Sequence, residues 1–222
     1  MFKHEASWLA RHLAQRTPAE LSPVLNIGSS TRQFRERDQP WVHKTLVAPL
    51  EQRGIRVVHL DFRDGDGIDI RADMLSDADF ERIKATGPRS ILCCNVLEHV
   101  EEPKKLAERC IELVGPCGFI FITVPHSYPF HRDPIDTLYR PSPDRLAELF
   151  PGARLVHGEI IDVGESLRDE VKKRPWILLR PLFRFPVPFL GWAKWKRSMG
   201  KLYWLLHNYE VTGAVFQVPP KA

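Results

Sequence analysis

The sequence predicts an α/β fold built on a doubly wound, mostly parallel sheet. Short apolar runs alternate along the chain with amphipathic segments of helical period, which is the pattern of such sheets. Residues 90–125 hold one full unit: a strand without polar alternation, a helix, a Gly-Pro turn and a second apolar strand. The crossover of this βαβ unit should be right-handed, and a ligand should bind beyond the carboxyl ends of the strands.

Each element is expected from its local pattern. Strands are expected over 24–27, 55–60, 90–94, 119–124, 154–161 and 210–218, with a short segment over 68–73 between the second and third. Helices are expected over 5–16, 41–53, 77–84, 103–114 and 143–150. Pro103 and Pro143 suit first helical positions, Gly115 ends a helix, and Pro125 is expected to end a strand. The last two strands should form an edge pair.

Composition is typical of a folded globular protein. The chain has 222 residues, of which 43% are hydrophobic and 27% charged, and this length suits one domain over 1–222. The four cysteines follow no zinc-binding or disulfide spacing, so we expect buried, reduced thiols in a cytoplasmic protein. The charged N-terminus does not look like a signal peptide, and no apolar run is long enough to cross a membrane.

Three strand ends carry residues suited to a nucleoside ligand. Gly28, Ser29 and Ser30 follow the first strand, where a glycine lets the backbone approach a ligand closely. Asp61 ends the second strand and can accept hydrogen bonds from both ribose hydroxyls, although a solvated turn aspartate is the alternative. Asp73 can hold an adenine amino group, with Met74 packed on the ring.

The segment after the 90–94 strand is the most specific motif. This segment, Asn95–Val100, reads Asn-Val-Leu-Glu-His-Val. It lies within a region, from about Pro23 to Pro151, that resembles class I S-adenosylmethionine-dependent methyltransferases. The resemblance rests on this motif, on the loop Val24–Ser30 and on Asp61. It implies a Rossmann-like sheet of seven strands, S-adenosylmethionine as cofactor and methyl transfer to an acceptor, with Asn95 and Val96 on the methionine side of the cofactor.

Two positions depart from the family pattern. Asn26 stands where many members carry an acidic residue, and Ser30 stands where a second glycine is usual. Asn26 is still assigned to the cofactor site. Two alternatives remain beside a methyltransferase: a non-catalytic protein of this fold, peripheral at a membrane, and another nucleotide enzyme such as a dehydrogenase-like domain. Fold alone does not separate them.

The segment 125–141 is a long polar and aromatic loop, of the length that usually has a function. We expect it to contact the acceptor, a small molecule or a glycan. His126 is the favoured catalytic base and His131 the second candidate, because a histidine can remove a proton near neutral pH. Asp133, Asp136 and Arg140 are predicted to bind the substrate. The alternative is a structured surface loop. We predict no metal site here, since only one weak set of ligands is present.

The segment 171–209 is basic and aromatic. It holds nine of the Lys and Arg residues, no acidic residue and four of the six tryptophans. We expect residues 168–208, which overlap this segment, to form an insertion or cap before the last strand. Trp195, Met199, Leu202 and Leu206 should share one helical face. Aromatic and basic side chains together suit an anionic membrane surface, and hence a glycan or lipid-linked acceptor. Packing on the sheet edge is the alternative, and nucleic acid is an unlikely partner.

Overall fold

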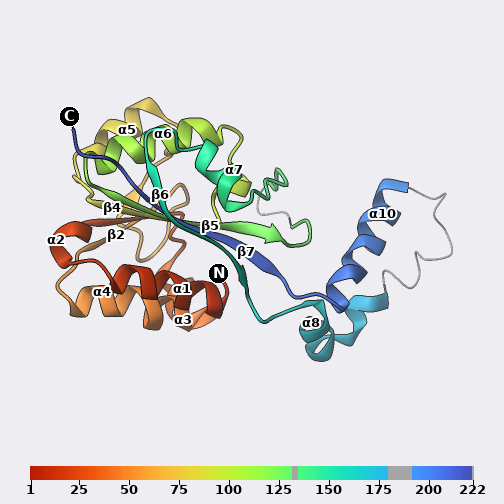
Figure 1. Cartoon of the computed structure of the whole chain (residues 1–222). Helices are drawn as coiled ribbons and strands as arrows, with labels where there is room; N and C mark the ends of the chain where they lie inside the picture. Colours follow the sequence, from red (N-terminus) through yellow and green to blue (C-terminus); the bar gives the residue numbers. More distant parts are fainter. Residues whose placement is uncertain (132–134, 180–191, 222) are drawn as a thin grey trace.

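The computed structural model describes residues 1–131, 135–179 and 192–221, and all statements below concern these residues. The chain forms one seven-stranded sheet with helices on both faces (Figure 1). The strands, in chain order, are β1 (Val24–Ile27), β2 (Val57–Asp61), β3 (Ile70–Arg71), β4 (Ser90–Cys94), β5 (Phe119–Ser127), β6 (Arg154–Asp162) and β7 (Glu210–Gln217). Their order across the sheet is β3-β2-β1-β4-β5-β7-β6.

The first five strands are parallel, and the last two complete the sheet in antiparallel pairs. β7 lies between β5 and β6 and pairs antiparallel with both, as the sequence predicts for an edge pair. From β1 the chain adds β2 and β3 on one side, and from β4 it adds β5 on the other side. In such sheets a crevice forms between the carboxyl ends of the two central neighbours, here β1 and β4. The predicted doubly wound, mostly parallel sheet is therefore confirmed.

Two helical layers cover the sheet (Figure 1). One layer contains α1 (Lys3–Ala14), α2 (Pro18–Leu21), α3 (Pro40–Val42) and α4 (Ala48–Gln52), and the other contains α5 (Asp77–Lys84), α6 (Pro103–Val114) and α7 (Pro143–Glu148). In β4, Ile91 and Cys93 pack toward the second layer and Leu92 toward the first, because successive side chains of a strand point to opposite faces. All three are almost completely buried. The absence of polar alternation in this strand reflects that burial.

Two predicted elements differ in detail. The predicted helix 41–53 contains a π-helical turn, His43–Val47, in which the Ala48 N–H bonds to the carbonyl of His43. Pro49 follows directly, and the wider turn suits a proline that cannot donate to the helical ladder. β5 also continues past Pro125 to Ser127. Its pairing with β4 ends at Thr123, but its pairing with β7 continues to Ser127 through a bulge between Pro125 and Ser127. The prediction that Pro125 ends the strand was wrong.

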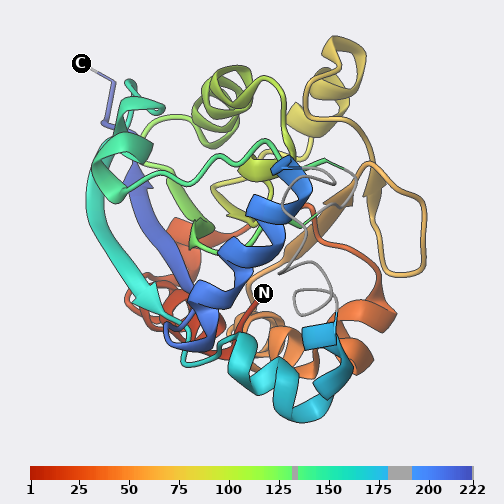
Figure 2. The ribbon, with the colours of Figure 1, turned by 90° about the vertical axis from the view of Figure 1, so that its right-hand side faces the viewer.

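Between β6 and β7 the chain forms α8 (Leu167–Lys173), a 3₁₀ turn (Pro175–Leu178), α10 (Trp192–Gly200) and a second 3₁₀ turn (Lys201–Leu205). These elements stand on the side to which β5 points (Figures 1 and 2). The prediction of one helical face from Trp195 to Leu206 was wrong, since the α-helix ends at Gly200 and the chain tightens into a 3₁₀ turn. Leu206 is 86% exposed. The basic residues Arg180 and Arg184 lie outside the described residues.

Candidate cofactor and acceptor site

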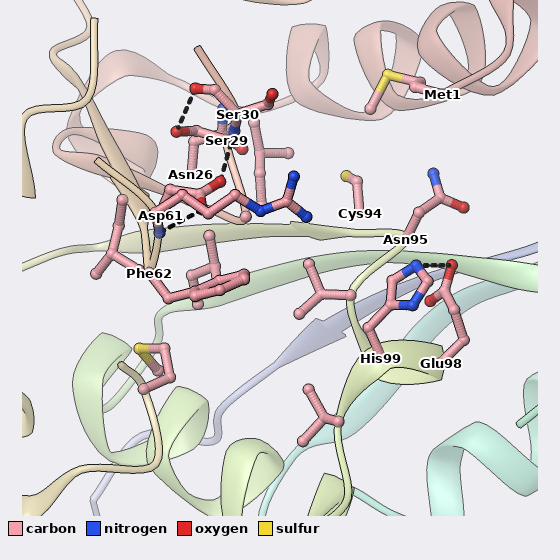
Figure 3. A pocket seen from close by; sticks show the side chains of 18 of the residues that line it. Met1, Asn26, Ser29, Ser30, Asp61, Phe62, Cys94, Asn95, Glu98 and His99 are labelled. Carbon is pink, nitrogen blue, oxygen red and sulfur yellow. Dashed lines mark hydrogen bonds and ion pairs between the residues drawn. The ribbon is translucent and has the colours of Figure 1, made fainter. Parts of the chain in front are cut away.

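A cavity of about 1510 Å³ opens at the carboxyl ends of β1, β2 and β4 (Figure 3). Every residue predicted from the sequence to bind the cofactor lines this cavity. These residues are Asn26, Gly28, Ser29, Ser30, Asp61, Asp73, Met74, Asn95 and Val96. They come from segments up to 70 positions apart in the chain, which parallel strands bring to one edge of the sheet.

The loop after β1 passes very close to the loop after β4. Gly28 has φ +67°, and a Cβ atom at this position would lie 2.6 Å from Cγ2 of Val96. Glycine is therefore required twice, by the left-handed backbone and by the contact. Ser30, with φ 56°, also has a left-handed backbone, and its N–H donates to Oδ2 of Asp61 at 2.8 Å.

Arg35 holds the same loop from behind. Its guanidinium is buried and donates to the carbonyls of Ser29 (3.2 Å), Ser30 (2.5 Å) and Gly67 (2.7 Å). Burial lowers the pKa of Arg35, and the neighbouring Asp69 opposes this. The side chain thus ties the loop after β1 to the loop after β2.

Asp61 is buried at the end of β2 and keeps acceptor capacity for a ligand. Its Oδ2 accepts from Ser30 N–H and its Oδ1 from Arg63 N–H at 3.0 Å. A carboxylate has about four lone-pair sites, so two remain after these bonds. Asp61 also lines the cavity, which is the arrangement expected of a group that accepts two ribose hydroxyls.

Met74 and Asp73 form a third wall. Met74 is buried in the hydrophobic cluster between the sheet and α5–α6, while Asp73 is exposed. Oδ1 of Asp73 accepts from Leu75 N–H at 2.8 Å, so this carboxylate also shapes its own turn.

The side chain of Asn26, at the position where many class I methyltransferases carry an acidic residue, contacts the ring of His59. Its amide nitrogen lies 3.2 Å from Nδ1 of His59. Burial, together with the charge of Arg35, lowers the pKa of His59 to about 4. His59 is therefore neutral at pH 7, and Asn26 meets no positive charge that would favour an aspartate.

Asn95 is fixed by a buried glutamate from the first helix. Its amide donates to Oε1 of Glu5 at 2.7 Å, and the Thr123 hydroxyl donates to the same oxygen at 2.5 Å. Phe2 N–H donates to Oε2 of Glu5 at 2.8 Å. These bonds hold the start of α1 against β4 and β5, so Met1 and Phe2 also line the cavity.

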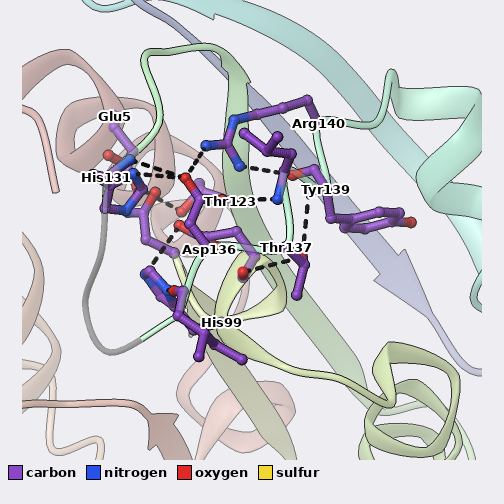
Figure 4. A network of polar contacts seen from close by, with 12 residues as sticks. Glu5, His99, Thr123, His131, Asp136, Thr137, Tyr139 and Arg140 are labelled. Atoms are coloured by element: carbon purple, nitrogen blue, oxygen red, sulfur yellow. Dashed lines mark hydrogen bonds and ion pairs between the residues drawn. The ribbon is translucent and has the colours of Figure 1, made fainter. Parts of the chain in front are cut away.

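The opposite end of the cavity contains Glu98, His99 and His131 (Figures 3 and 4). Glu98 is completely buried, and neither carboxylate oxygen has a hydrogen-bond partner. Burial raises the pKa of Glu98 to about 8. The rings of His99 and His131 meet edge to face, with centroids 5.1 Å apart. Tyr128 lies beside them, and burial raises its pKa to about 12.

Of the predicted acceptor residues that the structure describes, His126, Asp136 and Arg140 do not line the cavity. Nδ1 of His126 lies 3.2 Å from the carbonyl of Pro141 and 3.4 Å from Oγ1 of Thr212. Asp136 and Arg140 bond to each other at 2.8 Å, and Asp136 also accepts from His131 N–H. Asp136 and Arg140 therefore organise the 128–141 loop from within (Figure 4). Asp133 lies outside the described residues.

No protein-family model matches the sequence, and no curated protein matches it. Solved structures do match. A coclaurine N-methyltransferase bound to N-methylheliamine and SAH is similar over 94% of this chain and 70% of its own, with a TM-score of 0.53 and 14% identity. A SAM-dependent methyltransferase from Archaeoglobus fulgidus is similar over 97% of this chain and 94% of its own, with a TM-score of 0.50 and 11% identity. The chain has the class I methyltransferase fold.

Within this class I fold, several residues around the cavity were not indicated by the sequence. Arg35, Glu5 and Tyr128 each lack a local motif, and their roles come from contacts with distant segments. Glu98 and His99 belong to the segment on which the resemblance rests, but neither was assigned a role. For Glu5 the sequence held one signal, a charged residue on the face of α1 that packs on the sheet, where it is completely buried.

Proposed function

We propose that the protein binds S-adenosylmethionine in this cavity and transfers its methyl group to an acceptor. The observation that supports this most directly is the convergence of all nine predicted cofactor residues on one cavity. Asp61, with two lone-pair sites left, accepts the ribose hydroxyls, and the Gly28 loop approaches the amino-acid part. Asp73 and Met74 hold the adenine, and Asn95 faces the methionine side.

The acceptor enters from the end of the cavity that contains Tyr128 and His131. Methyl transfer is an in-line displacement at carbon, so the acceptor atom has to lie opposite the sulfur, and alignment supplies much of the rate. Of the two predicted catalytic histidines, His131 lines the cavity and His126 does not. The geometry therefore favours His131 for a role at the acceptor. Its pKa is lowered by burial, so the ring is neutral at pH 7.

Calorimetric titration with S-adenosylmethionine and S-adenosylhomocysteine tests the proposal. Asp61→Ala should weaken binding by about 1–3 kcal/mol, which is roughly 5- to 150-fold, because hydrogen bonds to a charged group are lost. Asp64→Ala is the matched control: Asp64 is an exposed aspartate three residues further on and does not line the cavity. If the wild-type protein bound neither molecule, the non-catalytic alternative would take the place of this proposal.

A second candidate function concerns the segment 171–209. Five of the eight exposed large hydrophobic residues in the described part of the chain lie there: Trp176, Leu179, Trp192, Tyr203 and Leu206. Exposed Lys172, Lys173, Arg174, Lys196 and Lys201 accompany them. We infer that this segment contacts an anionic membrane surface and that the acceptor is a glycan or a lipid-linked precursor. Among the described residues, no helix has the length and hydrophobicity needed to cross a bilayer.

Sedimentation with liposomes tests the membrane interaction. The wild-type protein should pellet with anionic vesicles at low salt and stay in solution with neutral vesicles, since the attraction is electrostatic and screened by salt. A variant with Lys173, Arg174, Lys196 and Lys201 changed to Glu should remain in solution with both. Wild-type protein that stays in solution with anionic vesicles at low salt would exclude the membrane surface as a partner.

A further inference from the structure

Glu98, His99 and His131 form a compact group of possible metal ligands at the acceptor end of the cavity. One ligand atom from each lies within 4.8 Å of the others. Oε1 of Glu98 is 3.7 Å from Nε2 of His99. Ligands bound to one divalent ion at about 2.0–2.2 Å lie some 3–4 Å apart, so small side-chain movements would bring the three atoms into coordination distance.

No described residue donates a hydrogen bond to the carboxyl group of Glu98, and the His99 ring at 3.7 Å lies beyond hydrogen-bond distance. Its side chain is completely buried, and both oxygens lack a hydrogen bond. Leaving a buried carboxyl group without a hydrogen bond is costly in either protonation state, and natural proteins satisfy such groups with a hydrogen-bond donor, an ion pair or a metal. The backbone around Glu98 is rigid, since its carbonyl accepts from both the N–H and the hydroxyl of Thr137.

A backbone carbonyl orients the ring of His99, and a carboxylate lies close to the ring of His131. Nδ1 of His99 lies 2.5 Å from the carbonyl of Ile135. A carbonyl only accepts, so Nδ1 carries a proton, and in the neutral ring the lone pair is on Nε2. Nδ1 of His131 lies 3.4 Å from Oδ2 of Asp136 without a hydrogen bond, and Asp136 accepts a hydrogen bond from Arg140. A carbonyl or carboxylate behind the ring is the usual second contact of a metal-binding histidine.

We propose that Glu98, His99 and His131 bind one divalent transition-metal ion, and that this ion binds a hydroxyl oxygen of the acceptor. Two imidazoles with one carboxylate favour zinc, manganese, iron or cobalt over magnesium and calcium, which prefer oxygen ligands alone. Three protein ligands leave coordination positions open, and the partly exposed His99 and His131 place those positions toward the cavity. Glu98 closes the buried side.

The ion gives the acceptor end a defined chemistry. A hydroxyl bound to a divalent cation loses its proton to solvent water far more readily than a free one. The resulting oxygen anion forms a bond to the methyl carbon, while the carbon–sulfur bond breaks and its electron pair stays on sulfur. The products are a methyl ether and the neutral thioether S-adenosylhomocysteine. The substrate class is thus a hydroxylated acceptor, and this step rests on the proposed methyl transfer.

Metal binding is measured on tag-free, full-length protein stripped with a chelator. Equilibrium dialysis with Mn²⁺, Zn²⁺ and Co²⁺ should show one ion per chain, with weaker binding of Mg²⁺ and Ca²⁺. Glu98→Gln and His131→Asn should each lower the affinity for Mn²⁺ about 100-fold or more, because ligands matter at least as much as their supporting contacts. Glu101→Gln, an exposed glutamate on the same loop, should bind as the wild type does.

Thermal unfolding separates a ligand from a structural residue. Mn²⁺ should raise the Tm of the wild type and of Glu101→Gln, and should not change the Tm of Glu98→Gln. Without metal, Glu98→Gln should be close to the wild type in stability, since it exchanges one buried polar side chain without a hydrogen bond for another of the same shape. Absence of Mn²⁺, Zn²⁺ and Co²⁺ binding by the wild type would overturn the proposal, as would equal binding by Glu98→Gln.

A titration of the metal-free protein with S-adenosylmethionine keeps this proposal distinct from the proposed function. If the cofactor binds and no metal does, the metal site is wrong and methyl transfer stands. If a metal binds and the cofactor does not, the metal site stands and the proposed function is wrong.

Discussion

Replacing Gly28 by alanine tests how the loops after β1 and β4 form the cavity at the carboxyl ends of the strands. The added methyl group has two separate effects. A left-handed backbone costs an L-residue about 1–2 kcal/mol. The new Cβ would also lie 2.6 Å from Cγ2 of Val96, well inside normal contact, and overpacking of this kind costs about 1–3 kcal/mol. The expected loss in the free energy of unfolding is therefore roughly 2–5 kcal/mol.

Gly54 supplies a matched control for the backbone effect. It has φ +74°, and a Cβ atom there would meet nothing within 4 Å. Gly54→Ala should lower the free energy of unfolding by about 1–2 kcal/mol through the backbone alone. The difference between the two glycine variants then measures the steric contact with Val96.

Urea denaturation of a double-mutant cycle completes the experiment. Val96→Ala removes the methyl group that the added Cβ of Gly28→Ala would strike, so it should restore most of the steric part in the double variant and none of the backbone part. In calorimetry, Gly28→Ala should bind S-adenosylmethionine more weakly than the wild type, and the double variant should recover part of that affinity. Equal destabilisation by Gly28→Ala and Gly54→Ala, or no coupling to Val96→Ala, would refute the close approach of the two loops.

Three further substitutions examine the supports of the cavity. For His59, the folded pKa is about 4 against an unfolded value of about 6.5, so its neutral ring favours folding above pH 6.5. The difference in free energy of unfolding between the wild type and His59→Gln should therefore fall by up to about 3 kcal/mol from pH 7 to pH 4. Urea denaturation at each pH measures this difference. A constant difference would show that His59 titrates normally. Arg35→Lys should cost about 2 kcal/mol and weaken cofactor binding, because one ammonium does not reach three carbonyls, whereas the exposed Arg37→Lys should change neither. Glu5→Gln should lower the free energy of unfolding by about 1–3 kcal/mol, since an amide nitrogen would face a donor; an unchanged value would mean that these bonds contribute little.

The sequence by itself determined the α/β fold and which residues gather at the carboxyl ends of β1, β2 and β4. Apolar runs without alternation marked β4 and β5, and a proline and a glycine marked the ends of α6. These signals are local, because periodicity and caps depend on neighbouring residues. Gly28, Asp61 and Asn95 could be placed together in advance, because parallel strands bring their carboxyl ends to one edge whatever the details of packing.

Only the tertiary structure decided which residues of the 125–141 loop face the cavity. β5 runs three residues past the predicted end at Val124, so His126 becomes a strand residue on the opposite side from Pro125, which lines the cavity. A shift of one position in a strand reverses the direction of a side chain, and the sequence did not reveal that β7 would pair there. Nor did it reveal that Glu98 would be buried without a partner beside two histidines, one of them 33 positions further along the chain. Such contacts depend on how distant segments pack, which local patterns do not record.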